Sequence, residues 1–224
     1  MKLNDKVFDK WVCWARRIEM DLQEIVNNQQ VYREFSRVVC ENWEHISANE
    51  GAFFCEFVQK CYGVQAAVGV RRHLDKSSDC VSLRKLMDQI KMCAAQFTFN
   101  FYLERFPLDD DKVKWQKSTF SLFSHDGKVL AEDIVERDIN EATNLGEQIR
   151  RFVNRELAHL GKKDYRGKLT LNDIEKSIDL FNQLACKYVC LLTGDGYDTL
   201  EPEILFDWTQ VFRVPLDVGG PEEC

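Results

Sequence analysis

The sequence predicts an all-α protein: a helical bundle over residues 1–224, built as a single domain with a short C-terminal extension. Six segments place apolar residues at the three- and four-residue spacing of a helix with one buried face. Alternating apolar and polar runs, which are typical of strands, are almost absent outside residues 97–132. The 224-residue chain contains only 4 Pro and 11 Gly, which favours long elements joined by few turns.

The first third of the chain is expected to form three helices. Apolar residues repeat at intervals of three and four over residues 4–27, and the polar run 27–30 is expected to end this first helix. A second helix is expected over 31–46, a turn over 47–51 and a third helix over 52–74. The apolar positions expected to face inward on the third helix are Phe54, Phe57, Val58, Cys61, Val64 and Val68.

The middle of the chain is predicted to be less regular, from residue 93 to residue 132. Before it, Ser82 is expected to cap a shorter helix that runs through Met92. Residues 107–111 are expected to form a loop, whose acidic run lacks the alternating ligands and the trailing Glu of a calcium loop. Residues 124–127 are expected to form a turn with an exposed His125.

The last part of the chain is expected to contain two helices that pack as an antiparallel pair. The first starts near Asp133 or Asp138. Thr170 with Asp173 resembles a capping box and starts the second, which ends at Gly194. The tail from about residue 195 is expected to wrap the bundle. Its apolar contacts are expected to come from Leu205, Phe206, Trp208 and Phe212.

Nine cysteines are scattered along the chain, and no Cys-x-x-Cys occurs. An odd, scattered set at apolar helical positions is typical of small buried hydrophobes in a reducing compartment, so no structural disulfide is expected. Cys186 and Cys190 lie one helical turn apart and could ligate a metal, but no His or second Cys pair lies beside them. The sequence therefore predicts no metal site and no cofactor.

Charge is distributed unevenly along the chain. The net charge is −7, yet residues 149–168 hold seven basic side chains against Glu156 and Asp164, a local net charge of +5. The N-terminus lacks the apolar core of a secretory signal, and no run approaches the roughly 20 apolar residues of a membrane span. A cytoplasmic protein without membrane contact is therefore expected.

The basic stretch also holds the residues most typical of chemistry. Arg155 and His159 are one helical turn apart, so a regular helix places them on one side. That side flanks an apolar stripe, and Gly161 fits the position just after the last helical residue. The stripe comprises Ile149, Phe152, Val153, Leu157 and Leu160. The simpler alternative is an amphipathic helix with a basic C-terminus.

Four short motifs in this chain carry a family resemblance. Asn-Arg-Glu-Leu-Ala-His at 154–159 resembles the signature helix of HEPN-domain proteins, especially their abortive-infection AbiU-like branch. Val-Arg-Arg-His-Leu-Asp at 70–75, with Ser-Leu-Arg-Lys-Leu-Met at 82–87, is similar to the N-terminal half of that branch. Asp-Trp-Thr-Gln-Val-Phe at 207–212, with Pro215, is similar to its C-terminal end. The resemblance implies a HEPN-like helical bundle.

The resemblance also implies a chemistry. Many HEPN proteins are metal-independent ribonucleases, and their site is an Arg followed after four to six residues by His, often with Asn beside the Arg. Here Asn154 and His159 match, whereas the positions expected for the Arg hold Phe152, Val153 and Asn154. By this resemblance His159 would be the general acid or base, Arg155 would hold the scissile phosphate, and Asn154 would orient His159 or the ribose.

The resemblance further implies an RNA partner and a homodimer in which two such helices form a composite site. It suits a ribonuclease toxin or a phage-defence factor, with an antitoxin or defence partner. The candidate RNA contacts are Arg150, Arg151, Lys162, Lys163, Arg71 and Arg72. For Arg71 and Arg72 the alternative is helix-dipole complementation plus a local ion pair.

Two other functions remain open from the sequence. A non-catalytic HEPN-like module would bind RNA or a protein partner, and the displaced Arg favours it. An interaction scaffold unrelated to nucleic acid is favoured by the overall acidity of the chain. Salt-sensitive RNA binding would separate the scaffold from the other two functions.

Overall fold

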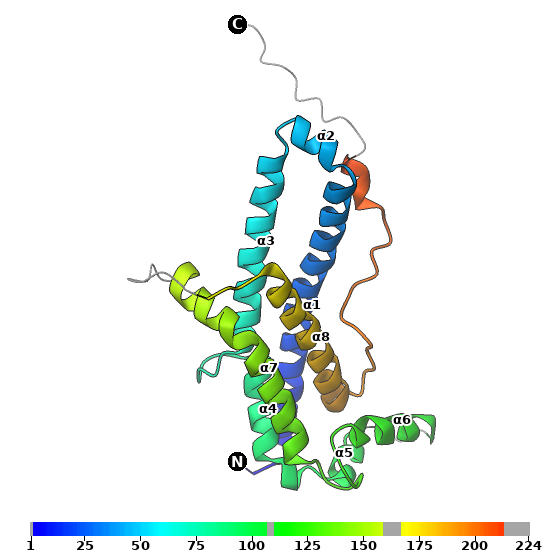
Figure 1. Cartoon of the computed structure of the whole chain (residues 1–224). Coiled ribbons are helices and arrows are strands. Elements are labelled where there is room, and N and C mark those ends of the chain that lie inside the picture. Colours follow the sequence, from blue (N-terminus) through cyan, green and yellow to red (C-terminus); the bar gives the residue numbers. More distant parts are fainter. Residues whose placement is uncertain (1, 107–109, 159–166, 213–224) are drawn as a thin grey trace, which may run out of the picture.

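Helices form most of the protein, as Figure 1 shows. The computed structural model describes residues 2–106, 110–158 and 167–212, with the backbone alone at 110–113. Within these ranges there are eight α-helices, and the only β pairing is an isolated bridge between Thr98 and Val129. The predicted all-α bundle is confirmed. None of the described helices is both long enough and apolar enough to cross a membrane.

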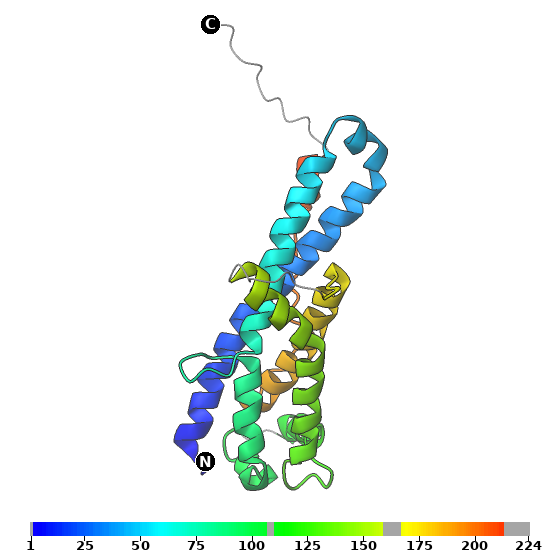
Figure 2. The same ribbon diagram turned by 60° about the vertical axis from the view of Figure 1, so that its left-hand side comes forward.

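Five helices build the bundle. They are α1 (Asp5–Glu41), α3 (Ala52–His73), α4 (Leu83–Met92), α7 (Glu132–Phe152) and α8 (Leu171–Thr193). The others are α2 (Trp43–Ala48), α5 (Phe99–Leu103), α6 (Asp110–Ser121) and the 3-10 helices Ala94–Gln96 and Trp208–Phe212. Figures 1 and 2 show that α1 and α3 continue beyond α7 and α8 and are joined by α2 at their far end.

Helix α1 is a single helix of 37 residues, so the expected break at 27–30 is wrong. The cause is Gln29, which is buried. Its Nε2 donates to the carbonyl oxygen of Glu175 at 3.3 Å and to Oδ1 of Asp179 at 2.9 Å, both on α8. Because the polar side chain is paired inside the bundle, it does not require the helix to end. Asn42 then separates α1 from α2.

The pair formed by α7 and α8 confirms several predictions. Thr170 and Asp173 form the capping box, and α8 ends at Gly194, whose φ of 75° lies in the left-handed region. The apolar face of α8 is buried, with Phe181 only 1% exposed. Helix α7 begins at Glu132, so the first of the two predicted starts, near Asp133, is the one observed. The two helices pack against each other and run in opposite directions in Figure 1.

Asp138 lies inside α7 because α8 supplies partners for its carboxylate. Lys187 Nζ lies 2.5 Å from Asp138 Oδ2, and the hydroxyl of Tyr188 donates to the same oxygen at 3.0 Å. Burial raises the pKa of Tyr188, and the neighbouring Asp138 adds to the shift. The phenol therefore remains a hydrogen-bond donor at neutral pH.

The predicted inward face of α3 is wrong. Phe54, Phe57, Cys61, Val64 and Val68 are exposed, and Val58 is half-buried. The buried residues of α3 are Tyr62, Ala66, Ala67, Gly69, Val70 and His73. A Cβ atom at Gly69 would lie 2.7 Å from Cδ1 of Ile25 on α1. Small residues therefore face inward, because the backbone of α3 lies close to large side chains of its neighbours.

The hairpin that projects at the α2 end has no buried side chain of its own. Between Phe35 on α1 and Tyr62 on α3, every residue is intermediate or exposed. We call residues 36–61 the projecting hairpin. Its two helices face each other without the cover of α7 and α8, as Figures 1 and 2 show.

The segment 93–132 is more ordered than predicted, because its aromatic residues form part of the core. Phe97, Tyr102, Phe120 and Phe123 are almost fully buried. Helices α5 and α6 carry two of them, and Thr98 caps α5 by accepting from the backbone of Phe101 at 3.1 Å. His125 is exposed as expected, and its Nε2 lies 2.9 Å from a carboxylate oxygen of Asp133.

The tail does not wrap the bundle through all the predicted residues. Leu205 and Phe206 are strongly exposed. The predicted contact of Phe212 is confirmed, since its ring centroid lies 5.9 Å from that of Phe35. Further contact comes from the buried residues Leu200 and Thr209. Residues 213–224 lie outside the described part of the chain.

The cysteines are less buried than predicted. Of the eight that are described, Cys93 and Cys186 are buried, and all eight are free thiols. Cys13, Cys40 and Cys61 are exposed. Cys224 lies outside the described residues. Burial raises the pKa of Cys186 to about 11, which keeps that thiol protonated and unreactive at neutral pH.

Candidate functional site

The candidate motif begins where α7 changes from an α-helix to a π-helix. Residues Val153–Leu157 form one π turn, in which the amide of Ala158 donates to the carbonyl of Val153 at 2.8 Å. This turn contains one more residue than a turn of α-helix, so the regular 3.6-residue spacing used to place Arg155 and His159 does not apply here. Single π turns inside α-helices are frequent at functional sites.

The π turn separates the motif residues into different environments. Val153 is 3% exposed and belongs to the core, so its predicted role as an inward-facing residue is confirmed. Arg155 is exposed to solvent. His159, Lys162 and Lys163 lie outside the described residues. Asn154 is half-buried and turns toward α3.

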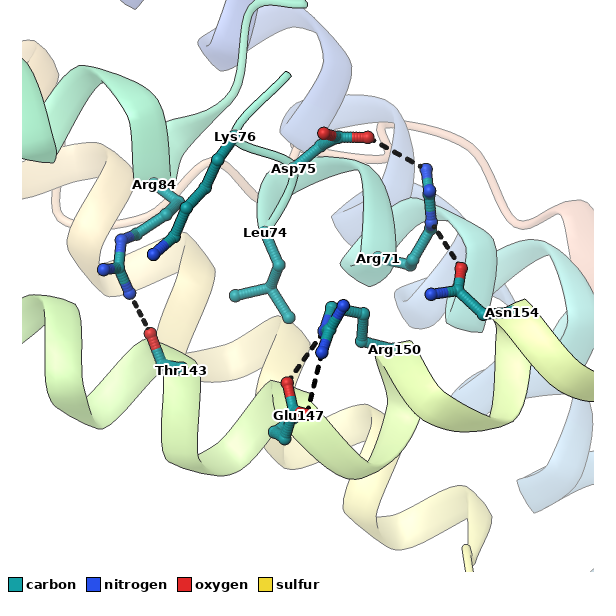
Figure 3. Close-up of a pocket in the computed structure, with 9 residues that line it drawn as sticks. All are labelled: Arg71, Leu74, Asp75, Lys76, Arg84, Thr143, Glu147, Arg150 and Asn154. Carbon is teal, nitrogen blue, oxygen red and sulfur yellow. Dashed lines mark hydrogen bonds and ion pairs between the residues drawn. The ribbon is translucent and has the colours of Figure 1, made fainter. Parts of the chain in front are cut away.

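A pocket of about 320 Å³ lies between the C-terminal half of α7, the end of α3, the loop after it and α4. Figure 3 shows the nine residues that line it. They are Arg71, Leu74, Asp75, Lys76, Arg84, Thr143, Glu147, Arg150 and Asn154. Four of these side chains are cations and two are carboxylates, so the lining carries an excess of positive charge.

Arg71 connects the two helices at one end of the pocket. Its Nε donates to Oδ1 of Asn154 at 3.1 Å, and its Nη1 lies 3.1 Å from Oδ2 of Asp75. Because Oδ1 of Asn154 faces Arg71, the Nδ2 group of Asn154 points away from it (Figure 3). That amide remains available as a donor beside the pocket.

Asp75 holds the loop that forms the next wall. Its Oδ1 accepts from the backbone amide and the hydroxyl of Ser77, and these bonds hold the pKa of Asp75 below its ordinary value. Ser82 donates to the carbonyl oxygen of Asp75 and caps α4, as predicted. The side chain of Lys76, on the same loop, is exposed.

Arg150 and Arg151 share one carboxylate on α7. Glu147 accepts from Nε of Arg150 at 2.8 Å, from Nη2 of Arg150 at 2.9 Å and from Nε of Arg151 at 2.9 Å. The hydrogen bonds from Arg150, together with those from Arg151, lower the pKa of Glu147 to about 2. Arg150 faces the pocket, whereas Arg151 does not line it.

Arg84 forms the far wall of the pocket, and its position is fixed by several partners. Its Nε lies 3.0 Å from Oδ2 of Asp88, and its Nη1 donates to the hydroxyl of Thr143. Only 12% of its side chain is exposed. The guanidinium therefore contributes a fixed positive charge, while Lys76 and Arg150 can reorient toward a ligand.

The structure brings together three of the predicted site residues, namely Arg71, Arg150 and Asn154. Arg72 points elsewhere, because its Nη2 pairs with Asp21 of α1 at 2.9 Å. For Arg71 and Arg72, the alternative of local and structural ion pairs is thus observed, and Arg71 additionally lines the pocket.

Sequence reasoning missed Lys76, Arg84, Thr143 and Glu147. The signal for Arg84 and Glu147 was present as opposite charges three or four residues apart, which pair on a helix surface. Nothing in a linear charge count places Lys76 beside α7. In the described part of the chain, no group of three or more His, Cys, Asp or Glu residues could hold a metal ion.

Comparison of this chain with protein-family models, with curated proteins and with solved structures gives no match. The site is therefore interpreted from its own geometry and charge.

Proposed function

We propose that this chain is a HEPN-like RNA-directed protein that binds the RNA backbone at the pocket between α3, α4 and α7. One observation carries the proposal. Asn154 of the motif Asn-Arg-Glu-Leu-Ala-His is fixed by Arg71 beside a pocket lined by four cationic side chains.

The chemistry of the lining suits a phosphodiester. Guanidinium groups bind phosphate oxygens with two parallel hydrogen bonds, and an ammonium group adds a point charge. Although Arg150 pairs with Glu147, 45% of its side chain is exposed, and the side chain of Lys76 is exposed. The Nδ2 group of Asn154 could donate to a phosphate oxygen or to a ribose hydroxyl. Glu147 and Asp75 orient the cations without neutralising all of them.

Binding is better supported than cleavage. Position 153 is one of those at which a HEPN ribonuclease would carry its arginine. In this chain it holds Val153, which is packed in the core. An arginine could not reach solvent from that position without disturbing the bundle. A non-catalytic RNA-binding module is therefore the form of the proposal that the geometry favours.

A metal-independent ribonuclease is the second candidate, and one observation favours it. Arg155 is exposed immediately after the fixed Asn154, and His159 follows four residues later in the sequence. A toxin or phage-defence role, with an antitoxin or defence partner, belongs to this second candidate.

The test of binding is a salt titration with a labelled single-stranded RNA. We expect Lys76→Ala and Arg150→Ala each to weaken binding at low salt. Each should reduce the slope of log K against log salt by about 0.7, as the loss of one phosphate contact does. Lys128→Ala is the matched control, because Lys128 is exposed near the other end of α7 and does not line the pocket. Equal binding by all four proteins would overturn the proposal.

The test of cleavage uses the same RNA. If the second candidate is correct, His159→Ala should lower the cleavage rate by about 10²–10⁴ while RNA binding persists. A wild type that binds RNA but leaves it intact would support the binding module instead.

A further inference from the structure

Helix α3 carries an apolar stripe that lies mostly on the side facing away from the bundle; its first residue, Phe54, also lines a cavity between α1, α2 and α3. The stripe comprises Phe54, Phe57, Cys61, Val64 and Val68, at successive intervals of three, four, three and four residues. This is the heptad spacing with which one helix packs against another in a coiled coil. We propose that the α3 stripe is the contact surface for a second copy of this chain, in antiparallel orientation.

The exposure of the stripe motivates the proposal. Phe54 and Phe57 are each 57% exposed, Val64 is 44% exposed, and Phe53 at the edge of the stripe is 80% exposed. The opposite side of α3 is the one that packs into the bundle, through Tyr62 and its buried neighbours. Within the described residues, the helix thus presents two apolar faces, of which only one is covered. A large uncovered apolar surface typically marks an interaction site.

The projecting hairpin provides a second, independent reason. Residues 36–61 include no buried side chain, although they form long helical segments. Two helices alone cannot enclose a core, since each has neighbours on one side only. In an antiparallel pair, the hairpin of each copy would lie against the C-terminal half of α3 in the other copy, which would cover its phenylalanines.

The side-chain sizes along the stripe favour a second copy in antiparallel orientation. Its N-terminal half holds phenylalanines, and its C-terminal half holds Cys61 and the two valines. An antiparallel copy places the large half of one stripe against the small half of the other, which fills the interface evenly. A parallel copy would place Phe against Phe and Val against Val. The antiparallel arrangement has two-fold symmetry and therefore uses the same patch on both copies.

The area is sufficient for a specific contact. Aromatic side chains bury about 150–250 Å² each, so Phe54, Phe57, the edge residue Phe53 and the two valines could bury on the order of 500 Å² per copy. That corresponds to roughly 1,000 Å² in total, the lower limit for a specific interface. Glu56 and Lys60, paired at 3.5 Å and both exposed, provide a polar edge.

This dimer differs from the one expected from the HEPN resemblance, which joins the helices that carry residues 154–159. It uses α3 and does not depend on RNA binding. Its test can therefore fail while the proposed function holds, and the reverse is also possible.

The experiment is sedimentation of the whole chain from about 1 to about 100 μM, since a dimer must dissociate on dilution. We expect a dimer at the upper concentration. The double variant Phe54→Glu/Phe57→Glu should raise the dimer dissociation constant at least about tenfold, because it places unpaired charges in an apolar contact. Met92→Glu is the control, since Met92 is equally exposed but lies at the end of α4. Circular dichroism should show that each variant keeps its helix content.

A cross-linking experiment locates the contact. In a Cys13→Ser/Cys40→Ser background, a short bismaleimide should give a covalent dimer that is lost on Cys61→Ser, because Cys61 is exposed in the middle of the stripe. A monomeric wild type at about 100 μM would overturn the proposal, and a protein partner would then be the remaining occupant. A dimer that persists unchanged in the double glutamate variant would also overturn it.

Discussion

The Nε atom of Arg71 lies 3.1 Å from Oδ1 of Asn154. This hydrogen bond joins two helices through residues that are 83 positions apart in the chain. The same guanidinium pairs with Asp75, so the end of α3, the loop after it and the π turn of α7 are fixed relative to one another. The candidate pocket is thereby preorganised before any ligand binds. Preorganised donors bind an anion with a smaller entropic cost.

We expect Arg71→Ala to lower the free energy of unfolding by about 1–2 kcal/mol, because a charge-assisted hydrogen bond between helices is lost. Arg72→Ala should change it by less than about 1 kcal/mol, since its pair with Asp21 is more exposed. Urea unfolding measures both. A double-mutant cycle with Asn154→Ala should give a coupling of about 0.5 kcal/mol or more. Zero coupling would show that the bond does not join the helices in solution.

We expect Glu147 to make the stability of the protein depend on pH in the acid range. Its folded pKa of about 2 lies below its ordinary value of 4.5, so its contribution is complete above pH 4.5. That contribution is lost as the pH falls from 4.5 toward 2. Glu147→Gln should flatten the pH dependence of the urea midpoint in this window. Glu141→Gln, an exposed position on the same helix, should leave the wild-type profile unchanged.

The contribution of Glu147 to stability should also depend on ionic strength. Its partners Arg150 and Arg151 are partly exposed, so added salt should weaken the effect of Glu147 on stability. A wild-type profile that is already flat between pH 2 and 4.5 would contradict the assignment.

We expect Phe181→Ala to lower the free energy of unfolding by about 3–5 kcal/mol, because the ring is 1% exposed and packs in the middle of the core. Phe206→Ala is the control, since that ring is 72% exposed and its truncation should change stability by less than about 0.5 kcal/mol. Equal effects from the two variants would mean that the face of α8 is misassigned.

We expect Lys187→Met to be strongly destabilising. The substitution leaves the buried carboxylate of Asp138 with only the hydroxyl of Tyr188, at a cost of about 3–5 kcal/mol. The double variant Lys187→Met/Asp138→Leu should recover much of that loss, since no buried charge remains. Thermal unfolding of the single and double variants measures the difference. A single variant as stable as wild type would show that Asp138 is hydrated.

Much of the fold could be predicted from the sequence, because capping residues and helical spacing act locally. Ser82, Thr170 and Gly194 marked helix ends correctly. The break expected at Gln29 was wrong, since its partners Glu175 and Asp179 come from a distant helix that a local pattern cannot reveal. At Gln29, the buried hydrogen bonds to α8 therefore outweigh the polar composition that predicts a helix end.

The face of α3 shows a different limit of sequence reasoning. Its apolar residues follow heptad spacing, and such spacing identifies a surface that contacts another helix without identifying the helix. The intramolecular contact uses small residues such as Ala66 and Gly69, which a search for large apolar residues overlooks. The candidate site was only partly predictable. Asn154 and Arg150 lie in the basic stretch of the sequence, whereas the loop that carries Lys76 lies beside them only in the folded chain.

The absence of buried side chains between Phe35 and Tyr62 has a consequence for local unfolding. Helix α1 is about 56 Å long, at 1.5 Å per residue, and its buried residues lie between Phe8 and Phe35. The amide protons of 36–61 should therefore exchange with solvent through local opening, well before those of α8 exchange through global unfolding. Hydrogen exchange measured at increasing protein concentration would then report on association, since covering the α3 stripe should slow exchange in this hairpin selectively.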